Sequence, residues 1–230
     1  MANNPILALT FDDHYVDDWL GAAPIFKAHG ARATFFVSGF PNVPSIGAMK
    51  LHKLLDQGHE IGFHSVSHAN AVETAKAKGI SAYVDSEIVP GLEAMKLMGF
   101  KPTSFAYPYN AHNNELDATL RPFFGVLRAR ADSLDEALQW SATKPVLRAR
   151  SCDSVRAGDG VSLRSTDDTV NELRLAARPG QVFALYAHGI SDTPVKHHAM
   201  TSRGLDYILW SAKRLGYSFA TASELHDVAA

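Results

Sequence analysis

Short apolar runs alternate with helix-forming segments along the whole chain, and this alternation constrains the fold more than any other feature. It is typical of parallel α/β sheets and barrels, in which a helix connects each strand to the next. We therefore predict seven or eight mostly parallel strands. The runs expected to form them are 6–11, 33–37, 60–64, 104–107, 125–129, 146–149, 181–187 and 218–221.

Apolar residues spaced three and four apart predict the helices between these strands. Segments 16–29 and 202–215 are expected to be helical, and the helix expected over 80–98 should kink or split at Pro90 and Gly91. Neither an internal repeat nor a low-complexity linker interrupts the pattern, so residues 1–230 are predicted to form a single domain. A further helix should end at Gly58 with these apolar side chains inward: Ile46, Met49, Leu51, Leu54 and Leu55.

Charge and cysteine content argue against several classes of protein. The formal net charge is -2 and no run of Lys and Arg exceeds two residues, so nothing favours nucleic acid or an anionic membrane as a partner. No apolar stretch approaches the roughly 18–20 residues of a membrane-spanning helix. Cys152 is the single cysteine, which excludes an intrachain disulfide. No signal peptide is visible, which leaves the location open between the cytosol and a bacterial envelope.

Polar side chains collect where the expected strands end. In parallel sheets and barrels, the carboxyl ends of the strands meet on one face, and active sites lie there. Histidines, aspartates and a tyrosine from distant parts of the chain are therefore expected to share that face. The residues at these ends are Asp12-Asp13-His14, Ser38-Gly39, His64 to His68, Pro108-Tyr109, Cys152-Asp153 and His188-Gly189.

His64 and His68 are four residues apart, so one helical turn would place both imidazoles on the same side. With the carboxylate of Asp13 they form a three-ligand set for a catalytic divalent ion, with open positions for water and substrate. Asp12 is then placed to take a proton from the activated water. Other interpretations remain open, because such histidine pairs occur by chance on surface helices and an aspartate here can cap the next helix.

The same residues carry a resemblance to a known family. Together they resemble the polysaccharide deacetylase family, also called the NodB-homology domain or carbohydrate esterase family 4, over about residues 5–223. The family motifs appear as Thr10-Phe11-Asp12-Asp13, His64-Ser65-Val66-Ser67-His68, Phe105-Ala106-Tyr107-Pro108-Tyr109 and Leu185-Tyr186-Ala187-His188.

The resemblance implies an irregular (β/α) barrel, and it also assigns roles to residues. Asp12 would be the general base, and Asp13, His64 and His68 would hold one divalent metal ion, Zn²⁺ foremost, with Co²⁺ or Ni²⁺ as alternatives. His188 would protonate the leaving amine or alcohol. The substrate would be an acetylated carbohydrate, and the family favours an extracellular or periplasmic location.

Other implied roles concern the oxyanion and the substrate. The backbone N–H of Tyr109 would stabilise the tetrahedral oxyanion, which makes Tyr109 both a catalytic and a substrate-binding candidate. Pro108 and Tyr186 are the neighbouring substrate-binding candidates. His14 stands where the family usually has glycine, and a substrate contact or a solvated loop is expected for it rather than metal ligation.

Three family motifs depart from the usual pattern. Ala106 occupies the place of an arginine that usually pairs with the catalytic base, so another cation is expected to orient Asp12. Tyr186 stands where an apolar residue commonly lines the acetyl pocket. The fourth motif lacks its tryptophan, and Asp153 is the candidate to orient His188. The candidates to orient Asp12 are Arg148, Arg150 and Arg156.

The sequence therefore favours a metal-dependent deacetylase acting on a polysaccharide, oligosaccharide or peptidoglycan. The altered pocket motifs keep open an alternative, hydrolysis of a non-carbohydrate C–N bond such as that of a cyclic imide or ureide. A catalytically silent carbohydrate-binding relative is disfavoured because the expected base, ligands and acid are all present. An iron(II) oxygenase also uses two histidines and one carboxylate, but its ligands commonly lie on an all-β barrel.

Overall fold

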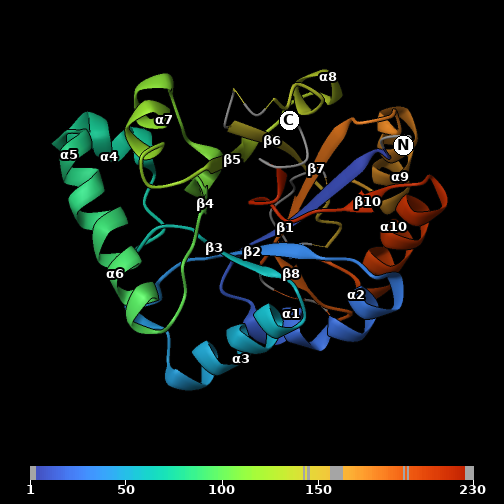
Figure 1. Ribbon diagram of the computed structural model, residues 1–230, viewed down its shortest axis with the longest axis horizontal. Coiled ribbons are helices and arrows are strands. Elements are labelled where there is room, and N and C mark those ends of the chain that lie inside the picture. The colour runs from blue at the N-terminus through green and yellow to red at the C-terminus, as the bar shows by residue number, and fades with distance from the viewer. Residues whose placement is uncertain are drawn as a thin grey trace.

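The computed structural model describes residues 4–141, 143, 146–155, 163–193, 195 and 197–225. Within these residues, seven parallel strands pair in the order β1 to β7, and β7 pairs back with β1 to close a barrel (Figure 1). The predicted α/β barrel is therefore confirmed. The barrel strands are β1 (Ile6–Asp13), β2 (Ala33–Val37), β3 (Glu60–Phe63), β4 (Ser104–Ala106), β5 (Val126–Arg130), β6 (Val146–Ser151) and β7 (Val182–Ala187).

Helices surround the barrel, and three short strands complete the fold. Strand β10 (Ser218–Phe219) pairs with β1, while β8 (Gly189–Ile190) and β9 (Ala199–Met200) form a separate pair. No helix in the described residues is both long and apolar enough to cross a membrane. The helices are α1 (Val16–Gly21), α2 (Ala23–His29), α3 (Ser45–Asp56), α4 (Ala71–Lys78), α5 (Ile80–Tyr83), α6 (Val89–Leu97), α7 (Asn114–Leu120), α8 (Leu134–Ala137), α9 (Thr166–Ala176) and α10 (Ser202–Arg214), with single turns at Phe40–Asn42 and Pro108–Asn110 and a π-helical turn, η2, at Val84–Ile88.

Prolines divide two of the predicted helices. The helix expected over 16–29 is two helices that meet at Ala22, because Pro24 lies in the first turn of α2, where its missing N–H is tolerated. The break expected near Pro90 is confirmed: the π-helical turn η2 ends at Ile88, and α6 begins one residue before the proline.

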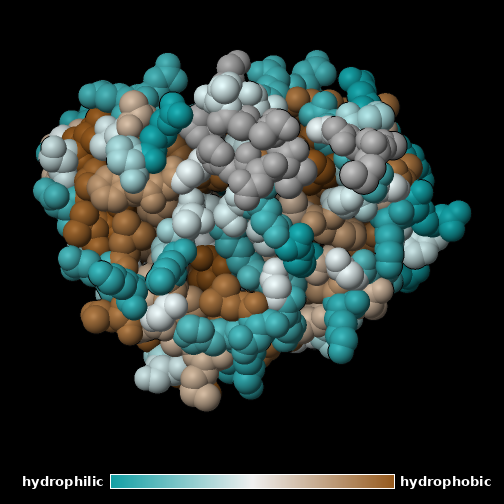
Figure 2. All heavy atoms as spheres, viewed as in Figure 1, coloured by the Kyte–Doolittle hydropathy of each residue, from teal (hydrophilic) through white to brown (hydrophobic). Residues whose placement is uncertain are grey.

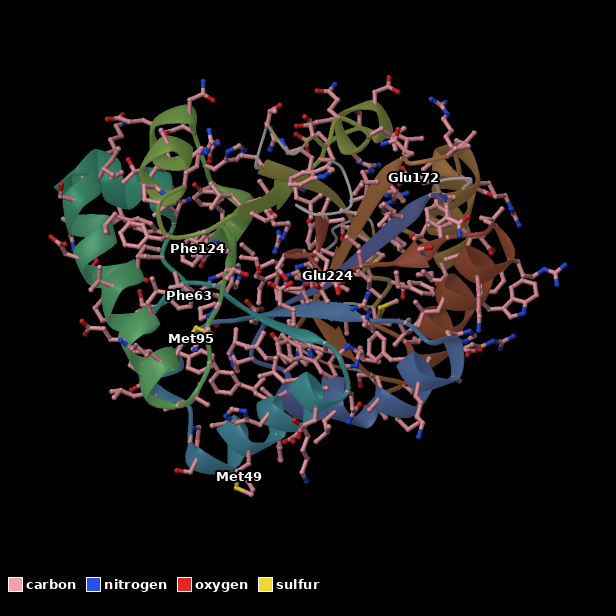
Figure 3. All side chains as sticks on the ribbon, in the orientation of Figure 1. Met49, Phe63, Met95, Phe124, Glu172 and Glu224 are labelled. Carbon is pink, nitrogen blue, oxygen red and sulfur yellow. The ribbon has the colours of Figure 1, made fainter. Side chains whose placement is uncertain are left out.

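The prediction for α3 is wrong at two positions. Leu51 and Leu54 are buried as expected, but the side chains of Ile46 and Met49 are 58% and 59% exposed. Figure 3 shows Met49 pointing away from the barrel, whereas Met95 lies on the inner side of its helix. Only one face of α3 packs on the strands, so apolar spacing alone overestimated the width of the buried stripe.

Side chains along the strands alternate between two apolar layers. Large aromatic side chains, such as Phe11, Phe35 and Phe105, pack outward against the helices. The barrel interior is instead lined largely by small side chains, among them Ala106 and Ala184. These small residues leave room inside the barrel for longer polar side chains near its carboxyl end.

The amino end of the barrel is closed by the chain that follows β10. Glu60 accepts hydrogen bonds from Thr34 Oγ1 at 2.9 Å, Ser104 Oγ at 2.6 Å and the backbone N–H of Ser223 at 3.0 Å. Glu224, labelled in Figure 3, pairs with Arg32 beside them. In the same view, Figure 2 shows hydrophilic side chains around a small apolar hollow. The carboxylates of Glu60 and Glu224 at this end therefore both have partners within the protein.

Candidate active site

Asp13, His64 and His68 meet at the carboxyl end of the barrel, where one candidate ligand atom from each lies within 4.8 Å of the others. Asp13 Oδ1 lies 3.2 Å from His68 Nε2 and 3.6 Å from His64 Nε2. This oxygen is buried and has no hydrogen-bond partner. A buried carboxylate oxygen without a donor is costly unless a cation binds it, so these residues fit a divalent metal ion.

The surroundings of His64 prepare it as a ligand. Its Nδ1 lies 2.8 Å from the carbonyl oxygen of Ala106, so Nδ1–H donates there and Nε2 keeps its lone pair for a metal. Burial lowers the pKa of His64 to about 4, so the ring is neutral at neutral pH. Burial would raise the pKa of Asp13, but the close contact with His68 and the nearby imidazoles of His64 and His188 hold it well below its usual range.

The segment that carries both histidines is a loop and not a helix, so the helical argument for their spacing is wrong. Ser65 and His68 have φ angles of 65° and 58°, which no α-helix contains. Glu87 in the π-helical turn η2 anchors the loop: its carboxylate accepts from the N–H of Ser67 at 2.8 Å and from its hydroxyl at 2.6 Å. A tertiary contact therefore brings His68 back toward His64.

Backbone strain is concentrated around this site. Among the described residues, the non-glycine residues with left-handed φ angles all belong to the site loops. Such conformations persist only where the surrounding structure holds them, and they cluster at functional sites. The residues are Asp13, Ser65, His68, Tyr109 and Asn110, with φ between 55° and 82°.

Asp12 lies inside the barrel and forms a buried ion pair with Arg128 of β5. The Arg128 side chain is fully buried and also donates to Asn110 Oδ1 at 2.6 Å. Its guanidinium lies 5.5 Å from the ring centre of Phe36 and 5.0 Å from that of Tyr186. Arg128 binds Asp12 Oδ2, while Asp12 Oδ1 stays buried without a partner.

The arginines predicted to orient Asp12 lie elsewhere. Arg148 pairs with Glu136 at 2.8 Å, Arg150 pairs with Glu172 at 2.9 Å, and Arg156 lies outside the described residues. Successive side chains of β6 point to opposite faces of the barrel wall, and Arg148 and Arg150 both point outward. They therefore meet Glu136 and Glu172 outside the barrel and do not reach Asp12.

Arg128 is the residue that sequence reasoning missed. It is the register partner of Ala106 on the neighbouring strand, so β5 supplies the cation that the third motif lacks. The small side chain of Ala106 leaves the space that Arg128 occupies. A signal was present, since Arg128 and Arg130 alternate with apolar residues in an otherwise buried strand.

His188 is held on three sides. Its Nδ1 lies 2.7 Å from Asp153 Oδ2, its backbone N–H donates to Asp153 Oδ1 at 3.0 Å, and its carbonyl accepts from Trp19 Nε1 at 2.8 Å. The structure thus shows the contact expected of Asp153. Burial would lower the pKa of His188, but the hydrogen bond and charge of Asp153 outweigh it and raise the pKa to about 9.

A pocket of about 510 Å³ joins these groups. Tyr109 and Tyr186 line it as predicted, but Pro108 and His14 do not. Pro108 is buried, and His14 stacks on Tyr15 and faces a neighbouring hollow beside α3. The lining residues that sequence reasoning did not anticipate are Tyr15, Tyr107, Asn110, Arg130, Ser151, Leu163, Arg164, His197 and His198.

Comparison with known proteins relates this geometry to a family. Residues 2–122 match the family model described as polysaccharide deacetylase. A peptidoglycan-N-acetylglucosamine deacetylase from Bacillus cereus is 25% identical over 227 residues, covering 97% of this chain and 89% of that protein. The chain spans between 24% and 49% of the length of the first curated relatives that it matches.

Solved structures share the fold. One is the Xyl-CE4 domain of a multidomain xylanase from the hindgut metagenome of Trinervitermes trinervoides, with 23% identity, a TM-score of 0.58 and coverage of 98% of this chain and 91% of that one. Another is a family 4 acetyl xylan esterase from Clostridium thermocellum with a cobalt ion, with 22% identity, a TM-score of 0.53 and coverage of 97% and 91%. The chain belongs to the polysaccharide deacetylase family.

Proposed function

We propose that the chain is a metal-dependent deacetylase that hydrolyses N- or O-acetyl groups on a polysaccharide, oligosaccharide or peptidoglycan. The observation that carries this proposal is the buried Oδ1 of Asp13, which lies close to two imidazole nitrogens and accepts no hydrogen bond, in the same pocket as the unpaired Oδ1 of Asp12. Family membership and relatives named as peptidoglycan and chitin deacetylases support the substrate class.

Asp13, His64 and His68 would hold the metal ion. Imidazole and carboxylate ligands suit Zn²⁺ first, with Co²⁺ or Ni²⁺ as alternatives, and the similar acetyl xylan esterase carries a cobalt ion. When bound, such an ion would lower the pKa of water toward neutrality, which supplies a nucleophile, and would stabilise negative charge on the acyl oxygen.

Asp12 is the proposed general base. Arg128 engages one of its oxygens and fixes the plane of the carboxylate, while the other oxygen remains without a donor. That free oxygen can accept the proton of the attacking water, and general bases of this kind contribute about 10²- to 10⁴-fold in rate.

Tyr109 and His188 are the proposed groups for two further steps: stabilising the negative charge on the acyl oxygen, and protonating the leaving group. Tyr109 has a left-handed φ angle and lines the pocket, and its backbone N–H would donate to the acyl oxygen as negative charge develops. Asp153 occupies Nδ1 of His188, so the other ring nitrogen is available to protonate the leaving amine or alcohol. With a pKa of about 9, His188 carries that proton at neutral pH.

Acetate release tests the proposal. We expect release from at least one of chitooligosaccharides, peptidoglycan and acetylated xylan, and we expect a chelator to abolish it until Zn²⁺ or Co²⁺ is restored. A cyclic imide serves as the counter-substrate. Turnover of the imide with no acetate from any glycan would replace the proposed function with hydrolysis of a non-carbohydrate C–N bond.

A further inference from the structure

A cationic side chain stands at the mouth of the pocket. Arg130 ends β5, two residues after Arg128, and alternate residues of a strand point to the same face. Arg130 therefore follows Arg128 toward the pocket mouth, and it lines the pocket together with the metal-site residues. The catalytic proposal above does not use it.

Arg130 is only weakly engaged by other groups. In the described part of the chain, its Nε pairs with Asp132 at 3.1 Å, and the two side chains are 57% and 84% exposed. Ion pairs this exposed contribute little and are screened by salt. The guanidinium is therefore available to an incoming anion.

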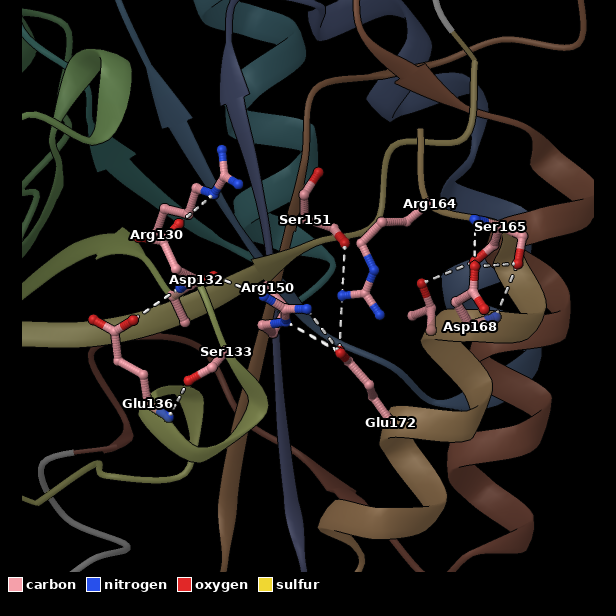
Figure 4. A network of polar contacts seen from close by, with 12 residues as sticks. Arg130, Asp132, Ser133, Glu136, Arg150, Ser151, Arg164, Ser165, Asp168 and Glu172 are labelled. Carbon is pink, nitrogen blue, oxygen red and sulfur yellow. Dashed lines mark hydrogen bonds and ion pairs between the residues drawn. The ribbon is translucent and has the colours of Figure 1, made fainter. Parts of the chain in front are cut away.

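A second cation borders the same pocket. Arg164 donates to Glu172 at 2.7 Å and to the carbonyl of Ser151 at 3.5 Å, while Arg150 donates to the same carboxylate at 2.9 Å. Among the described residues, two guanidinium groups thus share the single carboxylate of Glu172. Figure 4 shows Ser151, at the end of β6, between Arg130 and Arg164.

The acidic side chains at the base of the pocket are engaged by other groups. Asp12 is paired with Arg128, Asp153 is bonded to His188, and Asp13 would bind the metal ion of the proposed function. Positive charge therefore remains at the side of the mouth formed by β5 and β6. A neutral sugar would gain only ordinary hydrogen bonds from it, whereas a carboxylate matches the fork of a guanidinium and adds the attraction between opposite charges.

We propose that the preferred substrate is an acetylated glycan that carries a carboxylate, and that Arg130 binds this carboxylate at the pocket mouth, beside the group formed by Arg164, Arg150 and Glu172. This inference rests on the proposed deacetylase function and specifies its substrate class. Two sources share this chemistry, the lactyl ether of a muramic acid residue and a uronic acid of an acetylated plant polymer.

Matched substrates test the proposal and separate the two sources. One pair is peptide-free peptidoglycan glycan strands before and after their carboxylates are reduced to alcohols. The other pair is O-acetylated glucuronoxylan before and after the same reduction. We expect reduction of the true substrate to raise KM about five- to tenfold with little change in kcat, and added salt to narrow the difference.

Variants then assign the effect to one side chain. Arg130→Gln should raise KM for the carboxylated member of the pair about five- to tenfold and leave kcat/KM for the reduced member within about twofold. Asp132→Asn, which removes the competing carboxylate, should lower KM for the carboxylated member. Arg214→Gln, which changes an arginine stacked on Trp210 of α10, is the matched control and should change neither.

The outcomes distinguish the two proposals. Equal turnover of carboxylated and reduced substrates, or equal losses on both in Arg130→Gln, would overturn the role of Arg130 while leaving the deacetylase function intact. No acetate from any of the four substrates or from chitooligosaccharides would overturn both.

Discussion

The two ends of the barrel treat buried polar atoms in opposite ways. At the amino end, Glu60 accepts hydrogen bonds from three donors, and the chain after β10 covers it. At the carboxyl end, Asp12 and Asp13 each keep a buried oxygen with no partner. At the amino end the acceptors of Glu60 have donors within the protein, whereas at the carboxyl end the two free oxygens can be satisfied by a bound group.

Backbone conformation follows the same division. Among the described residues, every non-glycine residue with positive φ belongs to the site loops at the carboxyl end. Strain and unpaired acceptors both cost folding free energy, so the amino end and the two apolar layers must supply the stability that the site lacks. The comparison predicts that changes at one end alter function and that changes at the other alter stability.

The largest effect is expected for Asp13→Ala. Loss of the carboxylate ligand should remove the metal and reduce acetate release by about a thousandfold or more. Metal content by mass spectrometry and turnover check this, and full metal occupancy in the variant would contradict it.

Asp12→Asn should separate the base from the metal. The amide still accepts from Arg128 but cannot take a proton, so kcat should fall about 10²- to 10⁴-fold while metal content stays unchanged. Steady-state kinetics with metal analysis on the same sample measure both quantities. A variant with near-wild-type kcat would show that Asp12 is not the base.

The acid role of His188 predicts a particular pH dependence. Because the pKa of His188 is raised to about 9, the proton is present at neutral pH and is lost as the pH rises through about 9, so amide hydrolysis should fall there. Asp153→Asn removes the negative charge beside His188 that helps to raise this pKa, and should move the alkaline limb of the profile to lower pH. An alkaline limb unchanged in the variant would count against the assignment.

Leaving groups give an independent test of the same residue. His188→Ala should slow hydrolysis of an N-acetyl sugar by about 10²-fold or more, but should affect an activated aryl acetate much less, since its leaving group needs no proton. Equal losses on both substrates would indicate a structural role.

Arg128→Ala should lower both folding stability and activity. Breaking a buried ion pair leaves Asp12 uncompensated and is expected to destabilise the fold by about 3–5 kcal/mol, with a smaller loss of kcat than in Asp12→Asn. Adding Ala106→Arg, which returns a guanidinium from the neighbouring strand, should recover part of both losses. Denaturant unfolding and kinetics of the single and double variants decide this, and no recovery in either quantity would contradict it.

Glu60→Gln at the amino end is expected to have the smallest effect on activity. The amide keeps one acceptor oxygen but loses the charge and the second acceptor, so stability should fall by about 1–3 kcal/mol while metal content and kcat stay unchanged. Denaturant unfolding measures the first and acetate release the second. A large loss of turnover in the folded variant would break the division between the two ends.

Local pattern alone determined much of the architecture. The period of the apolar residues placed the strands of the barrel to within a few residues, and Pro90 placed the break in the helix expected over 80–98. Strand ends also placed Asp13, His64 and His68 on one face. These features depend on residues close together in the sequence, or on the rule that the carboxyl ends of parallel strands meet on one face. They do not depend on how particular side chains pack.

Tertiary structure decided the features that depend on register and packing. The space into which Arg128 reaches toward Asp12 exists because the pairing of β4 with β5 sets the small Ala106 directly beside Arg128. That register cannot be read from the sequence of either strand alone. The loop from His64 to His68 takes its shape from Glu87, which lies beyond α4 and α5 in the chain. The sequence by itself determined the barrel and the candidate ligands, whereas the three-dimensional fold decided which cation orients Asp12, because that contact is made between strands.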